Sequence, residues 1–205
     1  MVDMVDAVVG DAQEMWQELL GGRYQPTRAV LFRDAIQSAC GFAQSATGPF
    51  YCPADRKVYL DLGFFDELHK RFGAPGDFAQ AYVLAHEIGH HVQTVTGIES
   101  QVRRGQATSP SDRNALSVRL ELQADCFAGV WGHHANRAGG GVQLEPGDVE
   151  EGLRAASAIG DDRIQRMSGR SISPESFTHG SSEQRVTWFR RGLESGNPDA
   201  CHTFQ

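Results

Sequence analysis

The sequence predicts an α+β fold, mainly helical, in a single domain spanning residues 1–205. Apolar residues recur at helical spacing from Asp77 to Gly97 and again in residues 113–137, which predicts two central helices. Every second side chain of residues 57–62 is aliphatic, which is the pattern of a half-buried strand and predicts a small sheet. A hydrophobic content of 40% over 205 residues is enough for one sizeable core.

The shorter elements follow from the same spacing rules and from turn residues. Residues 48–53 predict an edge strand, because Pro49 and Pro53 cannot donate to a central ladder. Such an edge either binds an extended peptide or is simply capped. Residues 35–40 are ambiguous, and the polar residues 100–112 predict a mobile loop. Further helices are predicted at residues 3–20, 64–72, 146–167 and 182–193, and a further strand at residues 29–32.

The charge balance argues against a nucleic-acid partner, and the hydropathy argues against a membrane-spanning segment. The formal net charge is −7 and the chain has no run of Lys or Arg, so we expect no nucleic-acid partner. No apolar stretch approaches the roughly 18 residues that a membrane span needs. We therefore expect no membrane span in this chain.

The four cysteines are Cys40, Cys52, Cys126 and Cys201. Their spacing contains no Cys-x-x-Cys pair, which argues against a structural zinc finger. The most economical disulfide pairing joins Cys40 to Cys52 and Cys126 to Cys201, and it implies an oxidising compartment. Four buried free thiols in a cytosolic protein are the alternative.

The motif His86-Glu87-Ile-Gly-His90 lies in the first long helix. Residues four apart share one face of a helix, so His86 and His90 can hold one metal ion while Glu87 holds a water molecule. A catalytic zinc takes three protein ligands and leaves a position for water. The motif therefore requires a third ligand from another element.

The second long helix offers that ligand, because Glu121 and Asp125 lie one turn apart on one face. We predict that Glu121 binds the metal and that Asp125 accepts the spare N–H of a ligand imidazole. A pairing of Glu121 with Arg119 or Arg113, and a surface charge for Asp125, are the alternatives. The histidine motif favours the ligand interpretation.

A loop histidine, His179, is the candidate for stabilising the oxyanion of a peptide-cleaving reaction. It precedes a flexible glycine and the last helix, so it could lean over the metal; a capping or surface histidine is the alternative. Arg185 and Tyr82 are further candidates for contacts with the substrate or transition state. In this mechanism a metal-activated water attacks the peptide bond, and Glu87 serves as the general base.

With these residues in place, the chain resembles the neutral zinc metallopeptidases of bacteria from about Asp6 onward. The resemblance implies a zincin-like fold similar to the gluzincins, with one catalytic Zn²⁺ and Glu121 and Asp125 in the roles above. The stretch around His179 and Arg185 is also similar to a segment near the substrate in membrane-embedded prenyl-protein and heat-shock metalloproteases. The matching runs are residues 48–61, 79–93, 121–131, 159–162, 177–185 and 201–204.

Relatives in this family typically begin with a short cytoplasmic segment and one membrane-spanning helix, which this chain lacks. The resemblance therefore implies an extracytoplasmic location, periplasmic or at the cell surface. The chain is then either the ectodomain of a single-pass membrane protein or a soluble member of the family. The predicted disulfides agree with this location.

We expect a zinc metalloendopeptidase that acts on a peptide or protein substrate. Two other hypotheses are a catalytically silent zinc-binding scaffold and a zinc hydrolase acting on cell-wall peptide. The intact base Glu87 argues against the scaffold, and nothing in the sequence separates the other two. We expect the strand at residues 57–62 to border the cleft and the His179 loop to cover it.

Overall fold

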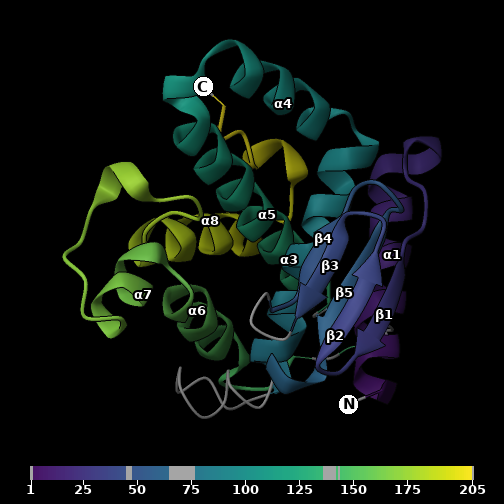
Figure 1. Cartoon of the computed structure of the whole chain (residues 1–205). Coiled ribbons are helices and arrows are strands. Elements are labelled where there is room, and N and C mark those ends of the chain that lie inside the picture. The colour runs from purple at the N-terminus through teal and green to yellow at the C-terminus, as the bar shows by residue number, and fades with distance from the viewer. Residues whose placement is uncertain (1, 45–47, 65–76, 136–141, 143, 205) are drawn as a thin grey trace.

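The computed structural model describes residues 2–44, 48–64, 77–135, 142 and 144–204. It confirms the predicted α+β class: most of the chain is helical, and the strands form two small sheets (Figure 1). The helices are α1 (Val2–Leu20), α3 (Asp77–Val95), α4 (Ile98–Thr108), α5 (Arg113–Ala135), α6 (Asp148–Ala158), α7 (Asp161–Met167) and α8 (Ser182–Ser195). The strands are β1 (Arg28–Phe32), β2 (Ala35–Ser38), β3 (Gly41–Gln44), β4 (Phe50–Cys52) and β5 (Lys57–Asp61).

The larger sheet has the order β1-β5-β4, with β1 parallel and β4 antiparallel to β5. The expectation that residues 57–62 border the cleft is wrong: β5 is central, and residues 58–61 are all buried. The cleft is bordered by β4, the edge strand, which lies between the two prolines as predicted. Tyr51 of β4 hydrogen-bonds His91 of α3 over 3.0 Å, which ties this edge to the central helix.

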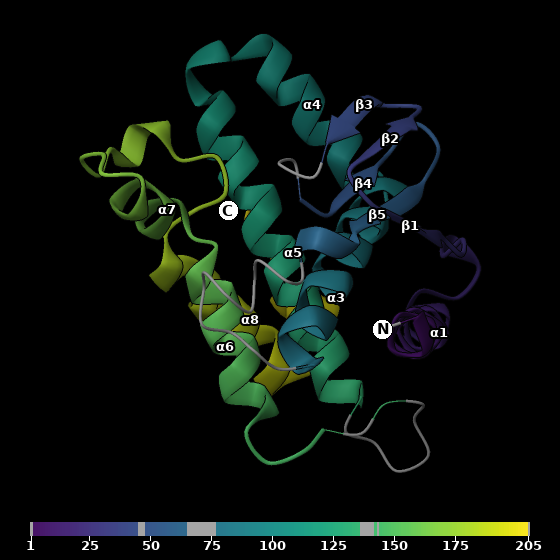
Figure 2. The ribbon, with the colours of Figure 1, turned by 60° about the horizontal axis from the view of Figure 1, so that its bottom comes forward.

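Helices α3, α5, α6 and α8 form the main helical layer, and α1 and the sheet cover the other side of α3 (Figure 2). Close approach between α3 and α5 depends on Gly89, where an added Cβ would lie 3.0 Å from the carbonyl oxygen of Ala124. The contact between α5 and α8 is tighter still, because Gly129 and Gly192 each face backbone of the other helix. These glycines allow the backbones of α5 and α8 to lie in direct contact.

Two segments differ from their predictions. Residues 98–108 form a helix, not a mobile loop, because Val102 is buried and Arg103 pairs with Glu99 one turn before it. The helix predicted at residues 146–167 is broken at Gly160, whose extended backbone separates α6 from α7. The ambiguous residues 35–40 begin the β2–β3 hairpin, and the helix predicted at residues 64–72 lies almost entirely outside the described residues.

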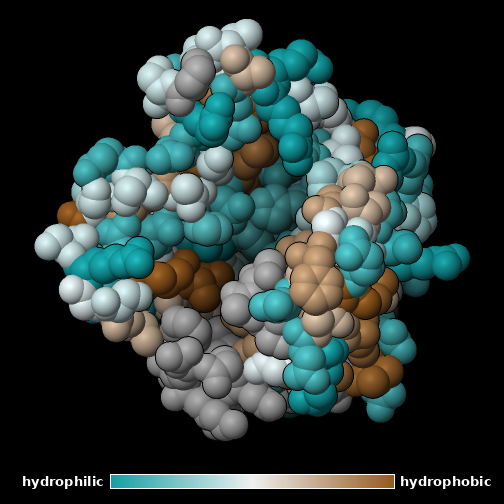
Figure 3. All heavy atoms as spheres, viewed as in Figure 1, coloured by the Kyte–Doolittle hydropathy of each residue, from teal (hydrophilic) through white to brown (hydrophobic). Residues whose placement is uncertain are grey.

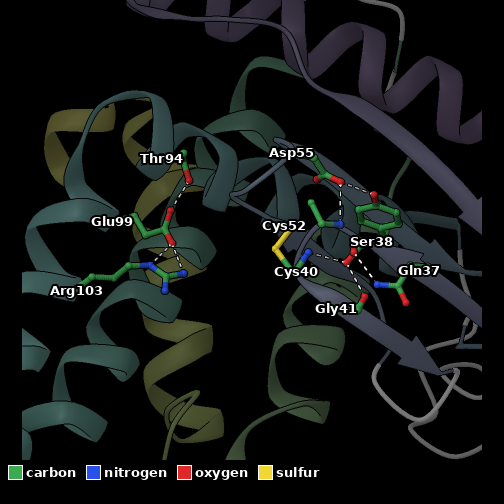
Figure 4. Close-up of a disulfide and its surroundings, with 11 residues drawn as sticks. Gln37, Ser38, Cys40, Gly41, Cys52, Asp55, Thr94, Glu99 and Arg103 are labelled. Carbon is green, nitrogen blue, oxygen red and sulfur yellow. Dashed lines mark hydrogen bonds and ion pairs between the residues drawn. A yellow bond between two sulfur atoms is a disulfide. The ribbon is translucent and has the colours of Figure 1, made fainter.

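Both predicted disulfides are present, so the alternative of four free thiols is wrong. Cys40–Cys52 joins the β2–β3 hairpin to β4 (Figure 4), and Cys126–Cys201 joins α5 to the C-terminal segment. Such bonds are typical of proteins in oxidising compartments. Among the described residues, no helix is both long and apolar enough to cross a membrane.

Candidate metal centre

Two imidazoles and one carboxylate converge where α3 crosses α5. His86 and His90 lie one turn apart on α3, and Glu121 projects from α5. The Nε2 atoms of His86 and His90 lie 3.2 Å and 3.4 Å from the two carboxylate oxygens of Glu121. One ligand atom from each residue lies within 4.8 Å of the others. The crossing therefore places three potential metal ligands around one point.

The second nitrogen of each imidazole is held by a separate partner. Nδ1 of His86 lies 2.8 Å from Oδ1 of Asp125, and Nδ1 of His90 lies 2.9 Å from Oε1 of Gln93. Because a carboxylate and an amide oxygen can only accept, each Nδ1 carries the proton. Both Nε2 atoms are then free of protons in the neutral imidazoles and can bind a metal.

This donor set fits zinc. Two imidazole nitrogens and one carboxylate oxygen are the protein ligands of many catalytic zinc sites, and the fixed tautomers point both nitrogens at the same place. The electrostatic potential at this point also favours a cation. Burial disfavours a charged imidazole, yet Asp125 and Glu121 raise the pKa of His86 to about 10. The same carboxylates would stabilise a divalent cation at this point.

Asp125 is the centre of a buried network behind His86. Its Oδ1 accepts hydrogen bonds from the Tyr82 hydroxyl at 2.5 Å and from Arg185 at 2.9 Å, and its Oδ2 accepts a second bond from Arg185 at 2.9 Å. Burial alone would raise the pKa of Asp125, but Arg185 and His86 hold it below its ordinary value. The carboxylate therefore stays ionised and fixes the imidazole.

The structure places Tyr82 and Arg185 against Asp125, where both hydrogen-bond its carboxylate. The side chain of Tyr82 is fully buried and its hydroxyl donates to Asp125, so it does not face a substrate. Arg185 borders the cleft, but it is only 2% exposed and its guanidinium forms a two-point pair with Asp125. Tyr82 and Arg185 thus fix the position of Asp125, which in turn fixes the His86 imidazole.

The candidate centre opens into a cleft of about 600 Å³, which Figure 3 shows as a hollow with a hydrophilic floor. Glu87 borders this cleft beside the two histidines. His179 borders it as well, with its side chain half exposed and its Nδ1 3.2 Å from Asp161. The cleft thus brings together the predicted base, the predicted metal ligands and the loop histidine.

Sequence reasoning missed Gln93, which is buried and holds His90. Its amide nitrogen donates to the backbone oxygen of Leu120 and to Gln123 on α5. The signal was available, since residues three apart on a helix are neighbours and an imidazole ligand needs a partner for its second nitrogen. An amide is less conspicuous in a sequence than a carboxylate.

Comparison with protein families agrees with this chemistry. Residues 1–204 match the family described as "Putative neutral zinc metallopeptidase". The chain is 51% identical over 201 residues to the uncharacterized protein YpfJ of Escherichia coli, a match that covers 96% of this chain and 69% of that protein. It is 41% identical over 208 residues to an uncharacterized protein of Mycobacterium tuberculosis, covering 98% of this chain and 69% of the relative. No solved structure matches.

Proposed function

Since the chain belongs to the neutral zinc metallopeptidase family, we propose that it is a zinc endopeptidase that cleaves peptide or protein substrates in the cleft described above. One observation carries the proposal. Ligand atoms of His86, His90 and Glu121 lie within 4.8 Å of one another, with Glu87 beside them in an open cleft. A structural zinc site would have four protein ligands and no need for an adjacent base.

The residues have distinct parts in the reaction. A single zinc ion held by His86, His90 and Glu121 would lower the pKa of a bound water and polarise the scissile carbonyl. Glu87 accepts a proton from the attacking water and passes it to the leaving amine. His179, which borders the cleft, donates a hydrogen bond to the developing oxyanion. Asp125 and Gln93 keep the two ligand imidazoles in the required tautomer and orientation.

The edge strand supports an extended substrate. Residues 48–51 and Pro53 border the cleft, and β4 pairs with β5 along its other side. A peptide can therefore add to β4 through main-chain hydrogen bonds, whatever its side chains. A second hollow shares Pro53, Glu99 and Arg103 with the first and extends to Cys40 of the Cys40–Cys52 disulfide. A groove that extends past the metal ligands favours cleavage within a chain.

The two disulfides support an extracytoplasmic place of action, periplasmic or at the cell surface, where such bonds persist. The substrates available there include proteins and the peptides of the cell wall. The cleft could bind either kind of substrate, because strand addition to β4 uses hydrogen bonds to the peptide main chain.

The test is cleavage of a peptide library, with cell-wall peptides as a separate arm, by the zinc-loaded chain and by Glu87→Gln. We expect the variant to keep its zinc and to lose cleavage by about 10²–10⁴-fold, because only the base is removed. Glu121→Ala is expected to lose zinc affinity as well as cleavage. Glu18→Gln, on the exposed face of α1, is the matched control. Equal cleavage by the wild type and Glu87→Gln would refute the mechanism, and zinc binding without any cleavage would favour the silent scaffold.

A further inference from the structure

The break between α6 and α7 places two adjacent acids, Asp161 and Asp162, against the segment that carries His179. Asp161 Oδ2 accepts hydrogen bonds from three consecutive backbone N–H groups: Thr178 at 2.8 Å, His179 at 2.6 Å and Gly180 at 3.0 Å. The backbone N–H of Asp161 donates to the carbonyl oxygen of Gly180 over 2.9 Å. One carboxylate oxygen therefore fixes the backbone of the loop on both sides of His179.

The other carboxylate oxygen of Asp161 engages the imidazole itself. Oδ1 lies 3.2 Å from Nδ1 of His179, and the Thr178 hydroxyl lies 3.0 Å from the same nitrogen. With Nδ1–H donated to Asp161, Nε2–H of the protonated ring is left to donate to a molecule in the cleft that His179 borders. The side chain of Asp161 is only 13% exposed, whereas that of His179 is 51% exposed.

Asp162 has a separate and purely structural set of partners. Its Oδ1 accepts from the backbone N–H of Ser182 at 2.7 Å and from the Ser182 hydroxyl at 2.8 Å. Gly160 lies so close to Ser182 that an added Cβ would overlap its backbone. Asp162 thus holds the start of α8 without touching the imidazole, although it lies next to Asp161 in the chain.

We propose that Asp161 is the positioning residue of the site, which orients His179 over the cleft so that its Nε2–H meets the oxyanion of the substrate. This rests on the proposed peptidase function and adds a residue that acts on the reaction through His179. The two acids have different contacts: Asp161 binds the backbone of the 178–180 loop and the His179 imidazole, and Asp162 binds the first residue of α8.

The charges around His179 favour the donor form. The hydrogen bond that the His179 ring donates to Asp161 raises the pKa of His179, and burial opposes it. Of the other charged groups that face the ring, Glu121 also raises the pKa and Arg185 lowers it. Because the protonated ring is the one that donates from Nε2 while Nδ1–H is bound to Asp161, activity that depends on it is lost as the pH rises through the pKa of His179. Removing the Asp161 charge moves that loss to lower pH.

The experiment compares Asp161→Asn with Asp162→Asn in the zinc-loaded chain. An asparagine oxygen can still accept the three backbone N–H bonds, so the loop is retained while the anionic partner of His179 is lost. We expect Asp161→Asn to lower kcat about 10–100-fold with little change in KM, and to shift the alkaline limb of the pH profile to lower pH. Asp162→Asn should leave the position of that limb unchanged. Equal shifts in both variants, or none in Asp161→Asn, would overturn the proposal.

A second readout does not depend on cleavage. The titration of the His179 ring, followed by NMR in the zinc-free wild type, is expected at a pH above the ordinary value for histidine and lower in Asp161→Asn. A wild-type ring that titrates at or below the ordinary value overturns the proposal even if the variants fail to fold. If the ring behaves as expected but the wild type cleaves no peptide, the positioning contact stands and the peptidase function fails.

Discussion

Gly192 of α8 lies directly on Cys126 of α5, so closely that a Cβ on Gly192 would overlap the Cys126 carbonyl oxygen. Gly129, one turn further along α5, meets the backbone of Phe189 in the same way. This contact brings Arg185, two turns before Gly192, against Asp125. The geometry of the metal centre therefore depends on Gly129 and Gly192, because they allow α8 to pack this closely on α5.

Gly192→Ala is expected to destabilise the fold by about 3 kcal/mol or more, at the upper end of overpacking effects, because the obstacle is backbone on both helices. Separation of α8 from α5 should also weaken zinc binding, since the Arg185–Asp125 pair is disturbed. The matched control is Gly10→Ala within α1, where an added Cβ meets nothing within 4 Å and helix propensity favours alanine by up to about 1 kcal/mol. Unfolding by denaturant and zinc affinity measure both effects. A Gly192→Ala protein as stable as the Gly10→Ala control contradicts the packing argument.

Asp125→Asn tests the network behind His86. The substitution keeps the shape but removes the charge that faces Arg185 and the imidazole, leaving the guanidinium buried at 2% exposure without its anionic partner. We expect zinc affinity to fall about 10–100-fold, as is typical when the partner of a ligand imidazole is changed. Stability should fall by about 3–5 kcal/mol, the usual cost of breaking a buried ion pair.

Competition with a chelator measures the zinc affinity of Asp125→Asn, and Asp162→Asn is the control, since it removes another hydrogen-bonded carboxylate away from the ligands. If both variants bind zinc as tightly as the wild type, then Asp125 has no part in holding His86.

The parts of the site that could be predicted are those carried by one helix at a time. The spacing of His86 and His90, and that of Glu121 and Asp125, is visible because residues four apart share a helix face. That the two pairs meet is a consequence of Gly89 packing on Ala124, which no local pattern encodes. The chemistry of the pairs suggested the meeting, and the helix crossing agrees with it.

The parts that could not be predicted depend on contacts between distant segments. From the sequence, Tyr82 was a candidate for contact with a substrate. Its burial against α5 and α8 depends on tertiary packing, which the local sequence does not show. The polar residues of α4 looked like a loop, because one buried Val102 and a packing contact of Gly105 with Leu116 are weak signals in a sequence. The role of Asp161 was hidden for the same reason, since its partners lie 17 to 19 positions further along the chain.

The C-terminal disulfide is linked to the metal centre through two buried glutamines. Gln93 holds His90, the Gln93 amide donates to Gln123 over 3.1 Å, and Gln123 donates to the carbonyl oxygen of Cys201 over 2.9 Å. Cys201 is fixed in turn by its bond to Cys126. Cys40–Cys52 lies on the hairpin and has no such connection among the described contacts (Figure 4).

Removing the two disulfides one at a time should therefore have different effects. Serine at Cys126 and Cys201 together is expected to lower stability by about 2–4 kcal/mol and to weaken zinc binding several-fold, because the Cys201 carbonyl is released and the orientation of Gln123 and Gln93 loosens. The Cys40–Cys52 bond closes a shorter loop, of separation 12 instead of 75, so serine at both of its positions should cost less stability and leave zinc affinity unchanged. Zinc titration and denaturant unfolding of both double variants measure this difference. Equal zinc affinities in the two variants would show that the glutamine chain does not carry the constraint to His90.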